Sequence, residues 1–270
     1  RESSELRKQG KFTEAIQAAE QAMEIAKAQG QPIQLASAHI NIGNVLMSQG
    51  KEAEVINGIR EVKPIVLASE DDQQIGRYYT LLGICYRLLG QYTLAIDNYR
   101  LALEHFERIP DGMNGVASCY SNLGIIFSDQ GNHEEAMKHY RKASEINQKL
   151  NNYDGIVGDY SRMGIGHALN NERKEALRCF DSALEVAFQH KLISHVPGLY
   201  HNRAKIQMYY GQLKAAEADF RKAISTASEI GRAIPQARAN INLAECLVAQ
   251  QRSKEAGSYL EEGLAFAKSS

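Results

Sequence analysis

Asparagine recurs along this sequence at spacings that are multiples of about 40 residues. The series consists of Asn41, Asn122, Asn202 and Asn242, and the two intervening places hold Leu81 and Arg162. A carboxamide carries both a donor and an acceptor, so one side chain can pair with the N–H and C=O of a single peptide unit. Asparagine is also a poor residue for helix interiors, so its regular recurrence invites a reason. The series favours binding of a polypeptide backbone. The alternatives are that each carboxamide bonds to its own helix, faces solvent, or recurs through internal duplication alone.

The other chemically active residues form no recognisable catalytic pattern. The sequence has no P-loop, nucleophile elbow, zinc-protease histidine pair or dinucleotide glycine fingerprint, so we expect no enzymatic activity and no cofactor. His190 and His195 flank the segment 191–194 and could form a surface feature or a weak metal site. The cysteines are too far apart in sequence for a metal-binding pair, and we expect buried apolar residues in a reducing compartment. They are Cys85, Cys119, Cys179 and Cys246.

Composition indicates an ordered protein with no general attraction to nucleic acid. The 270 residues are 44% hydrophobic, and 31 basic residues balance 32 acidic ones to a net charge of −1. No apolar run reaches the roughly 18 residues needed to span a bilayer, and no signal peptide is present. These features predict a cytoplasmic location. Because the chain starts without methionine and Arg1 falls inside a helical register, we expect a fragment of a longer protein.

Two small-residue markers recur with the same period as the asparagines. The first marker is Gly43, Gly83, Gly124, Gly164, Ala204 and Ala244. The second follows seven residues later, at Gly50, Gly90, Gly131, Asn171, Gly211 and Gln251, with an earlier copy at Gly10. Such self-similarity predicts a solenoid, in which each unit buries its apolar face against its neighbours.

One period can be divided into two helices. Apolar residues from Gly76 to Leu89 follow helical spacing, and Gly90 is expected to end that helix because it can adopt positive φ. Thr93 is expected to cap a second helix, which the segment 109–112 with its proline would stop. The unit is therefore predicted to be a helix pair of about 34 residues plus a loop of about six.

The order of residues within this unit resembles the tetratricopeptide repeat. The matching residues are Leu82, Gly83, Tyr86, Gly90, Tyr92, Ala95, Tyr99 and Ala102, and the next repeat matches nearly as well. The resemblance implies an all-α fold, a right-handed α-α superhelix of about seven helix–turn–helix repeats. The 40-residue period is similar to that of polarity and spindle-orientation adaptors and of bacterial signalling proteins. The expected repeats of this single array, 1–270, are 1–30 (truncated), 36–70, 76–110, 117–151, 157–191, 197–231 and 237–270.

Two repeats depart from the family pattern. Repeat two has Val55, Ile59 and Val62 in place of small or aromatic residues. Its second helix also contains Pro64, so we expect that helix to be kinked or cut near Lys63. In repeat six an Arg203-Ala204 pair replaces Leu-Gly, so packing there should be modified.

The resemblance also implies a concave wall formed by the first helices, and it places the asparagine series on that wall. One repeat would span about three residues of an extended peptide, so successive asparagines could hold its backbone. Basic residues on the same wall favour a partner with some acidic residues, although scattered solvated charges are the alternative. They are Arg77, Arg162, Lys205 and Arg238, together with Arg87. Apolar contacts are expected from Ile40, Met47, Ile84, Ile125, Ile165, Met208, Tyr209 and Ile241.

These features predict a protein–protein interaction module that binds an extended or partly helical peptide in its groove. The alternative is an intramolecular regulatory or sensor domain that controls an attached effector domain in a signalling protein. Neither function requires nucleic acid or a membrane span.

Overall fold

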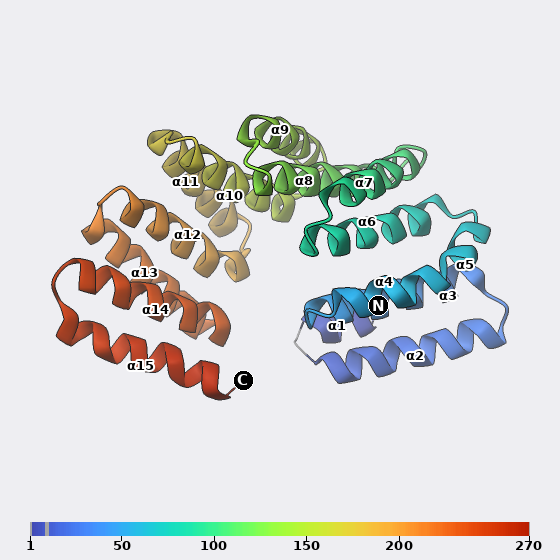
Figure 1. Ribbon diagram of the computed structural model, residues 1–270, viewed down its shortest axis with the longest axis horizontal. Coiled ribbons are helices and arrows are strands. Elements are labelled where there is room, and N and C mark those ends of the chain that lie inside the picture. Colours follow the sequence, from blue (N-terminus) through green and yellow to red (C-terminus); the bar gives the residue numbers. More distant parts are fainter. Residues whose placement is uncertain (1, 9–10, 270) are drawn as a thin grey trace. The chain divides into compact units, whose positions relative to one another are not determined.

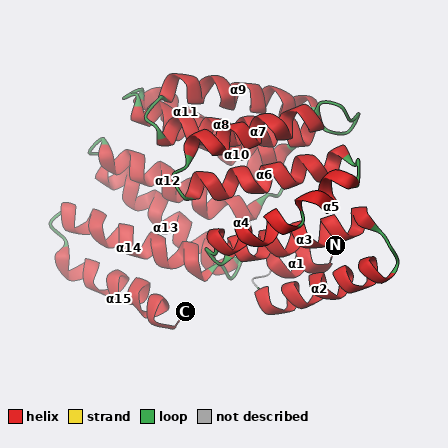
Figure 2. Ribbon diagram, turned by 45° about the vertical axis from the view of Figure 1, so that its right-hand side comes forward, coloured by secondary structure: helices red, strands yellow, loops and turns green. Residues whose placement is uncertain are grey.

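The computed structural model describes residues 2–8 and 11–269, and none of these residues is in a strand (Figures 1 and 2). Gly10, the first copy of the second marker, lies outside the described residues. The helices are α1 (Glu2–Lys8), α2 (Phe12–Ala28), α3 (Pro32–Ser48), α4 (Glu52–Glu61), α5 (Lys63–Ala68), α6 (Asp72–Leu88), α7 (Tyr92–Phe106), α8 (Met113–Asp129), α9 (His133–Lys149), α10 (Tyr153–Leu169), α11 (Arg173–Gln189), α12 (Val196–Tyr209), α13 (Leu213–Glu229), α14 (Ala233–Ala249) and α15 (Ser253–Ser269), with a 3₁₀ turn, η1, at Ile193–His195. The predicted all-α class of helical repeats is confirmed.

The chain divides into two compact units, residues 1–130 and 131–270. Unit 1 contains α1 to α8, and unit 2 contains α9 to α15. In each unit, a helix contacts the next one along the chain, and a first helix also contacts the first helix of the neighbouring repeat. This nearest-neighbour packing is the arrangement expected of a solenoid.

Longer helices, rather than longer loops, account for the 40-residue period. α10 and α11 each have 17 residues, and only three residues lie between Leu169 and Arg173. Two such helices and two such connections fill one period. The predicted six-residue loop is therefore wrong for most repeats, and α6 begins at Asp72 rather than Gly76. The longer connections are 107–112, where the proline lies, and 190–195, which contains η1.

The middle residue of each three-residue connection has positive φ. In the connection after α6, Gly90 has φ of 72°, and the N–H of Gln91 donates to the carbonyl of Tyr86 at 2.8 Å. This is the Schellman arrangement, which satisfies carbonyls at the end of a helix. The prediction for Gly90 is confirmed, but Thr93 is not the cap. The N-cap of α7 is Gln91, because the short connection places Thr93 inside the first turn.

Substitutions at these connections should change stability according to φ. Gly90→Ala is expected to cost about 1 kcal/mol, because a Cβ is disfavoured at positive φ. Lys191 has φ of 56° in the equivalent turn before η1, so Lys191→Gly should stabilise the fold by roughly 0.5 kcal/mol. Melting temperatures of the two variants test this, and a lower melting temperature for Lys191→Gly would contradict it.

Small residues let an aromatic ring pack directly on the neighbouring helix backbone. A Cβ added at Gly83 would lie 2.8 Å from the ring of Tyr99, and one at Gly164 would lie 2.7 Å from Phe180. Both rings are fully buried. The small residue of the first helix and the aromatic of the second therefore form one packing unit in each of these repeats.

The second helix of repeat two is broken, as Pro64 predicts. α4 ends at Glu61 and α5 begins at Lys63, with Val62 joining them. Proline lacks an N–H and clashes with the preceding turn, so a continuous helix is disfavoured there. Val55, Ile59 and Val62 are nevertheless buried against the first helix of the repeat.

Repeat six replaces the usual leucine with an ion pair. The guanidinium of Arg203 donates from Nε and Nη2 to the two carboxylate oxygens of Asp219, at 2.7 and 2.8 Å. Asp219 is buried, and Arg203 also bonds to the exposed Asp181. The predicted change of packing at Arg203 is therefore an electrostatic link between α12 and the second helices α11 and α13.

A second ion cluster joins α13 to α15. The carboxylate of Glu217 accepts hydrogen bonds from Arg252 at 2.7 Å, from Arg221 at 2.9 Å and from Gln250 at 3.0 Å. Burial alone would raise the pKa of Glu217, but these hydrogen bonds outweigh burial and lower the pKa to about 2. The cluster therefore holds the last helix through a carboxylate that must stay ionised.

The depressed pKa of Glu217 predicts a dependence of stability on pH. Because the folded pKa lies below the unfolded value of about 4.3, the contribution is present above that value and is lost as pH falls toward 2. At pH 7, Glu217→Gln should melt at a lower temperature than the wild type. The difference should shrink as pH falls from about 5 to 3. A difference independent of pH would contradict this assignment.

Candidate functional site

Successive first helices lie side by side in each unit. In unit 1, α6 contacts both α3 and α8, and in unit 2, α12 contacts both α10 and α14 (Figure 1). We call these two surfaces the first-helix walls. Each wall is made from the equivalent helices of successive repeats, so residues at the same position of each repeat recur along it. The asparagine series occupies one such position. Asn41 and Asn122 therefore lie on the wall of unit 1, and Asn202 and Asn242 lie on the wall of unit 2.

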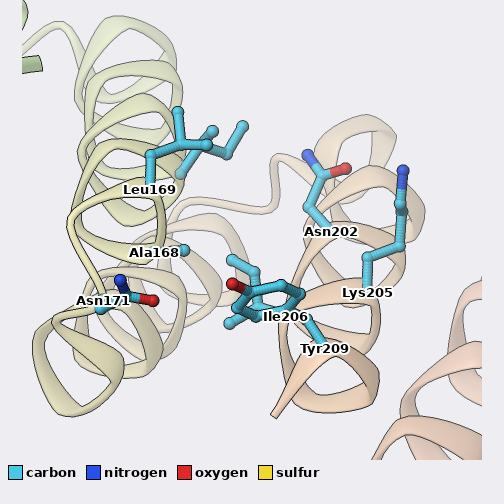
Figure 3. Close-up of a pocket in the computed structure, with 8 residues that line it drawn as sticks. Ala168, Leu169, Asn171, Asn202, Lys205, Ile206 and Tyr209 are labelled. Carbon is cyan, nitrogen blue, oxygen red and sulfur yellow. The ribbon is translucent and has the colours of Figure 1, made fainter. Parts of the chain in front are cut away.

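An apolar hollow on these walls lies in unit 2, between α10 and α12. We call it the α10–α12 hollow; its volume is about 390 Å³. Its rim includes large apolar side chains that are unusually exposed. Tyr209 is 73% exposed, Leu169 is 52% exposed and Ile165 is 40% exposed. The lining residues are Ile165, Ala168, Leu169, Asn171, Asn202, Lys205, Ile206 and Tyr209 (Figure 3).

The floor of the hollow is fixed by packing between the two helices. Ile206 belongs to the buried core of unit 2, and Ala168 packs against that core. The Tyr210 hydroxyl donates to the carbonyl of Ala168 at 3.3 Å, and the guanidinium of Arg173 lies 5.7 Å from the centre of the Tyr210 ring. Tyr209 extends from α12 toward Ala168 (Figure 3). The site thus combines a rigid floor with an exposed apolar rim.

The four asparagines have different surroundings. Within the described residues, the carboxamide of Asn202 makes no hydrogen bond, and it lines the α10–α12 hollow. Asn242 Nδ2 lies 3.2 Å from Nε2 of His201. In unit 1, Asn41 accepts a hydrogen bond from Arg77 at 3.2 Å. Asn122 donates to the carbonyl of Ser118, four residues earlier, at 2.8 Å, which is the alternative in which asparagine bonds to its own helix.

Four of the five predicted basic residues form two groups of two. Lys205 and Arg238 are exposed, and within the described part of the chain neither has an ion-pair partner. Burial, together with the charges of Lys205 and Arg238, lowers the pKa of His201 to about 4. Both cations are therefore close to this neutral imidazole, on the α12–α14 part of the wall.

The other two predicted basic residues already have partners. Arg162 Nη1 lies 3.4 Å from Oδ1 of Asp159, which is fully buried and also accepts from Asn147 at 2.7 Å. Arg77 bonds to Asn41 and, at 3.4 Å, to Gln74. The fifth predicted basic residue, Arg87, pairs with Asp129 within unit 1 at 3.2 Å.

The wall of unit 1 has a smaller hollow of about 290 Å³, which includes Arg77, Ile84 and Asn44. Leu81, which replaces asparagine in the series, is 2% exposed. Ile40, from which an apolar contact is expected, also lines this hollow, although it is only 1% exposed. The sequence does not indicate Leu169, Asn171 or Ile206 as site residues. They line the hollow only because α10 and α12, which are separate in the sequence, pack side by side.

The cysteines and histidines form no metal centre among the described residues. Three cysteines are buried, Cys179 is partly buried, and all four are free thiols. Burial raises the pKa of Cys85 and of Cys119 to about 12, so both remain protonated. The ring of His190 stacks on Tyr153, and His195 lies 2.7 Å from Asp154.

In the described chain, no helix is long and apolar enough to cross a membrane.

Comparison with known proteins identifies the repeat. The sequence profile of the tetratricopeptide repeat matches residues 74–149 and residues 201–270. The photosystem I assembly protein Ycf3 of Synechococcus elongatus is 30% identical over 112 residues. That match covers 41% of this chain and 62% of the length of Ycf3.

Two solved structures share the fold at low sequence identity. The apo form of the quorum sensor NprR from B. thuringiensis has a TM-score of 0.76 and 19% identity, over 96% of this chain and 72% of the other. The Rap conjugation gene regulator of plasmid pLS20, in complex with the Phr* peptide, has a TM-score of 0.64 and 18% identity, over 87% of this chain and 75% of the other. The profile matches, the repeated helix pairs and their small-residue packing agree, and the chain belongs to the tetratricopeptide repeat family.

Proposed function

We propose that this chain is a non-catalytic protein-interaction module and that its α10–α12 hollow binds an extended polypeptide segment. The observation that carries this proposal is the carboxamide of Asn202, which has no partner within the described residues and stands beside exposed Ile165, Leu169 and Tyr209. An apolar hollow with a few polar groups at fixed positions is the usual form of a ligand site.

Each part of the site would recognise a different part of the partner. The carboxamide of Asn202 would pair with the N–H and C=O of one peptide unit. A neighbouring apolar side chain would enter the hollow against Leu169 and Tyr209. Lys205 and Arg238 would bind carboxylates, so the favoured partner carries an apolar residue next to acidic ones. Asn242 would extend the backbone contact along the wall once its contact with His201 is released.

The related structures support a peptide as the partner. The Rap conjugation gene regulator is in complex with the Phr* peptide, and NprR is a quorum sensor. These two proteins also favour a second candidate, in which the repeats of this chain sense a peptide and regulate an attached effector domain. Both candidates use the same site.

We also propose that the seven repeats act as one array over 1–270.

A peptide selected from a random displayed library tests the site. The selected peptide is titrated by fluorescence anisotropy into the wild type, Asn202→Ala and the matched control Asn98→Ala. Asn98 lies on the second helix α7 and donates to the carbonyl of Leu94. Asn202→Ala should weaken binding by about 1–3 kcal/mol, or roughly 5- to 150-fold, because a peptide amide is left unpaired. Asn98→Ala should bind as the wild type does.

The charge of the site is tested with the same peptide. Lys205→Ala should weaken binding less as salt concentration rises, whereas the effect of Asn202→Ala should not depend on salt. Equal affinities for the wild type and Asn202→Ala, with equal melting temperatures, would contradict the proposed role of the α10–α12 hollow.

A further inference from the structure

A small hollow in unit 1 lies between the two helices of repeat two rather than on a first-helix wall. It has a volume of about 160 Å³ and is bounded by α3 and α4. Ile42 and Leu46 of α3 face Val55, Ile59 and Val62 across it, and all five side chains are buried or half-buried. We call it the α3–α4 hollow.

The hollow exists because repeat two lacks two side chains that other repeats have. At the register of His39 the next four repeats carry tyrosines, which are Tyr79, Tyr120, Tyr160 and Tyr200. At the register of Gly58 they carry Asn98, His139, Cys179 and Asp219. A Cβ added at Gly58 would meet nothing within 4 Å, so the space above this glycine is open. His39 has a smaller ring than tyrosine and Gly58 has no side chain, so the hollow lies beside both residues.

The size and lining of the hollow match a single aromatic ring. An engineered apolar cavity of about 150 Å³ in another protein binds benzene, so a hollow of this volume can hold one ring. The interior is lined mainly by aliphatic side chains, which favours an apolar occupant. Burial lowers the pKa of His39, so its imidazole stays neutral at pH 7 and adds no positive charge.

The rim of the hollow is acidic. Glu54 and Glu61 are both exposed and both line it. Glu54 pairs with the exposed Lys51 at 3.4 Å, whereas Glu61 has no ion-pair partner within the described residues. A ligand whose ring enters the hollow would therefore place its substituent beside at least one uncompensated carboxylate, which favours a cation.

We propose that the α3–α4 hollow binds a small molecule with one aromatic ring and a positively charged amine, an arylalkylamine. This site uses none of the residues of the α10–α12 hollow and does not depend on peptide binding. The ring would enter the space beside His39 and Gly58, and the amine would lie beside Glu54 and Glu61.

Calorimetric titration with 2-phenylethylamine tests this proposal, with phenylacetate as the probe of opposite charge. The wild type should bind 2-phenylethylamine saturably and bind phenylacetate at least about fivefold more weakly. Gly58→Leu fills the hollow without changing charge and should weaken binding by about tenfold or more. His39→Tyr places a larger ring at the edge of the hollow and should have the same effect.

Gly257→Leu is the matched control, because a Cβ at this helical glycine of α15 also meets nothing within 4 Å. It should bind the amine as the wild type does. Melting curves establish that each variant is folded. Non-saturable binding to the wild type would overturn the proposal, and so would unchanged affinity in both Gly58→Leu and His39→Tyr.

Discussion

Replacement of Asp219 by alanine is expected to lower the free energy of unfolding by about 3 kcal/mol, because it leaves the guanidinium of Arg203 without its two-bond partner. The side chain of Arg203 is 16% exposed and that of Asp219 is 5% exposed, so water cannot replace the lost contacts fully. Asp181 still pairs with Arg203, but it is 62% exposed and should compensate little. Urea denaturation followed by circular dichroism measures the loss.

A double substitution distinguishes the loss of the pair from the loss of packing. Repeat three has Leu82 and Asn98 at the registers of Arg203 and Asp219. Arg203→Leu combined with Asp219→Asn should therefore recover most of the stability, because an apolar replacement of a buried ion pair is often neutral. A double variant no more stable than Asp219→Ala would show that the ion pair is not the source of the effect.

The second large effect is expected at the contact between Gly164 and Phe180. Gly164→Leu should destabilise unit 2 by about 3 kcal/mol, because even the Cβ would lie 2.7 Å from the ring and 3.2 Å from the carbonyl of Ala176. Gly164→Ala should cost far less, since repeat six accommodates Ala204 beside Phe220 in the same arrangement. Melting temperatures of the two variants test the contact.

Gly257→Leu is again the control, because it adds the same side chain to a helix where space is open. It should be neutral or slightly stabilising, since leucine has a higher helix propensity than glycine. If Gly164→Leu melted at the temperature of Gly257→Leu, the account of close helix packing in this family of repeats would be wrong for repeat five.

Much of the fold could be predicted because its determinants are local and periodic. The small residue and the aromatic, as in Gly83 and Tyr99, recur at fixed spacing, and Pro64 interrupts a helix through its own covalent structure. The connections could be predicted only in part. Glycine marks positive φ at Gly90, but Glu70, Lys191 and Gln251 adopt the same conformation without a residue type that signals it. Their turns are imposed by the packing of long helices on both sides.

For the site, the sequence could predict only which residues occupy equivalent positions in successive repeats. Periodicity placed Asn202 and Asn122 at equivalent positions, but it could not show that Asn122 bonds to Ser118 while Asn202 lines a hollow. That difference depends on the adjoining helix, because a backbone carbonyl lies four positions before both asparagines. The α10–α12 hollow itself depends on the contact of Tyr210 with Ala168, which lies 42 residues away in the chain.

Binding at the α10–α12 hollow is the central claim, and one titration tests it most directly. The library-selected peptide is titrated into the wild type and into the double variant Asn202→Ala, Tyr209→Ala, beside melting curves of both proteins. Tyr209 is 73% exposed, so the double variant should keep the wild-type melting temperature. It should lose about 100-fold or more in affinity, because both the backbone contact and the apolar rim are removed. Unchanged affinity in a folded double variant would contradict the claim.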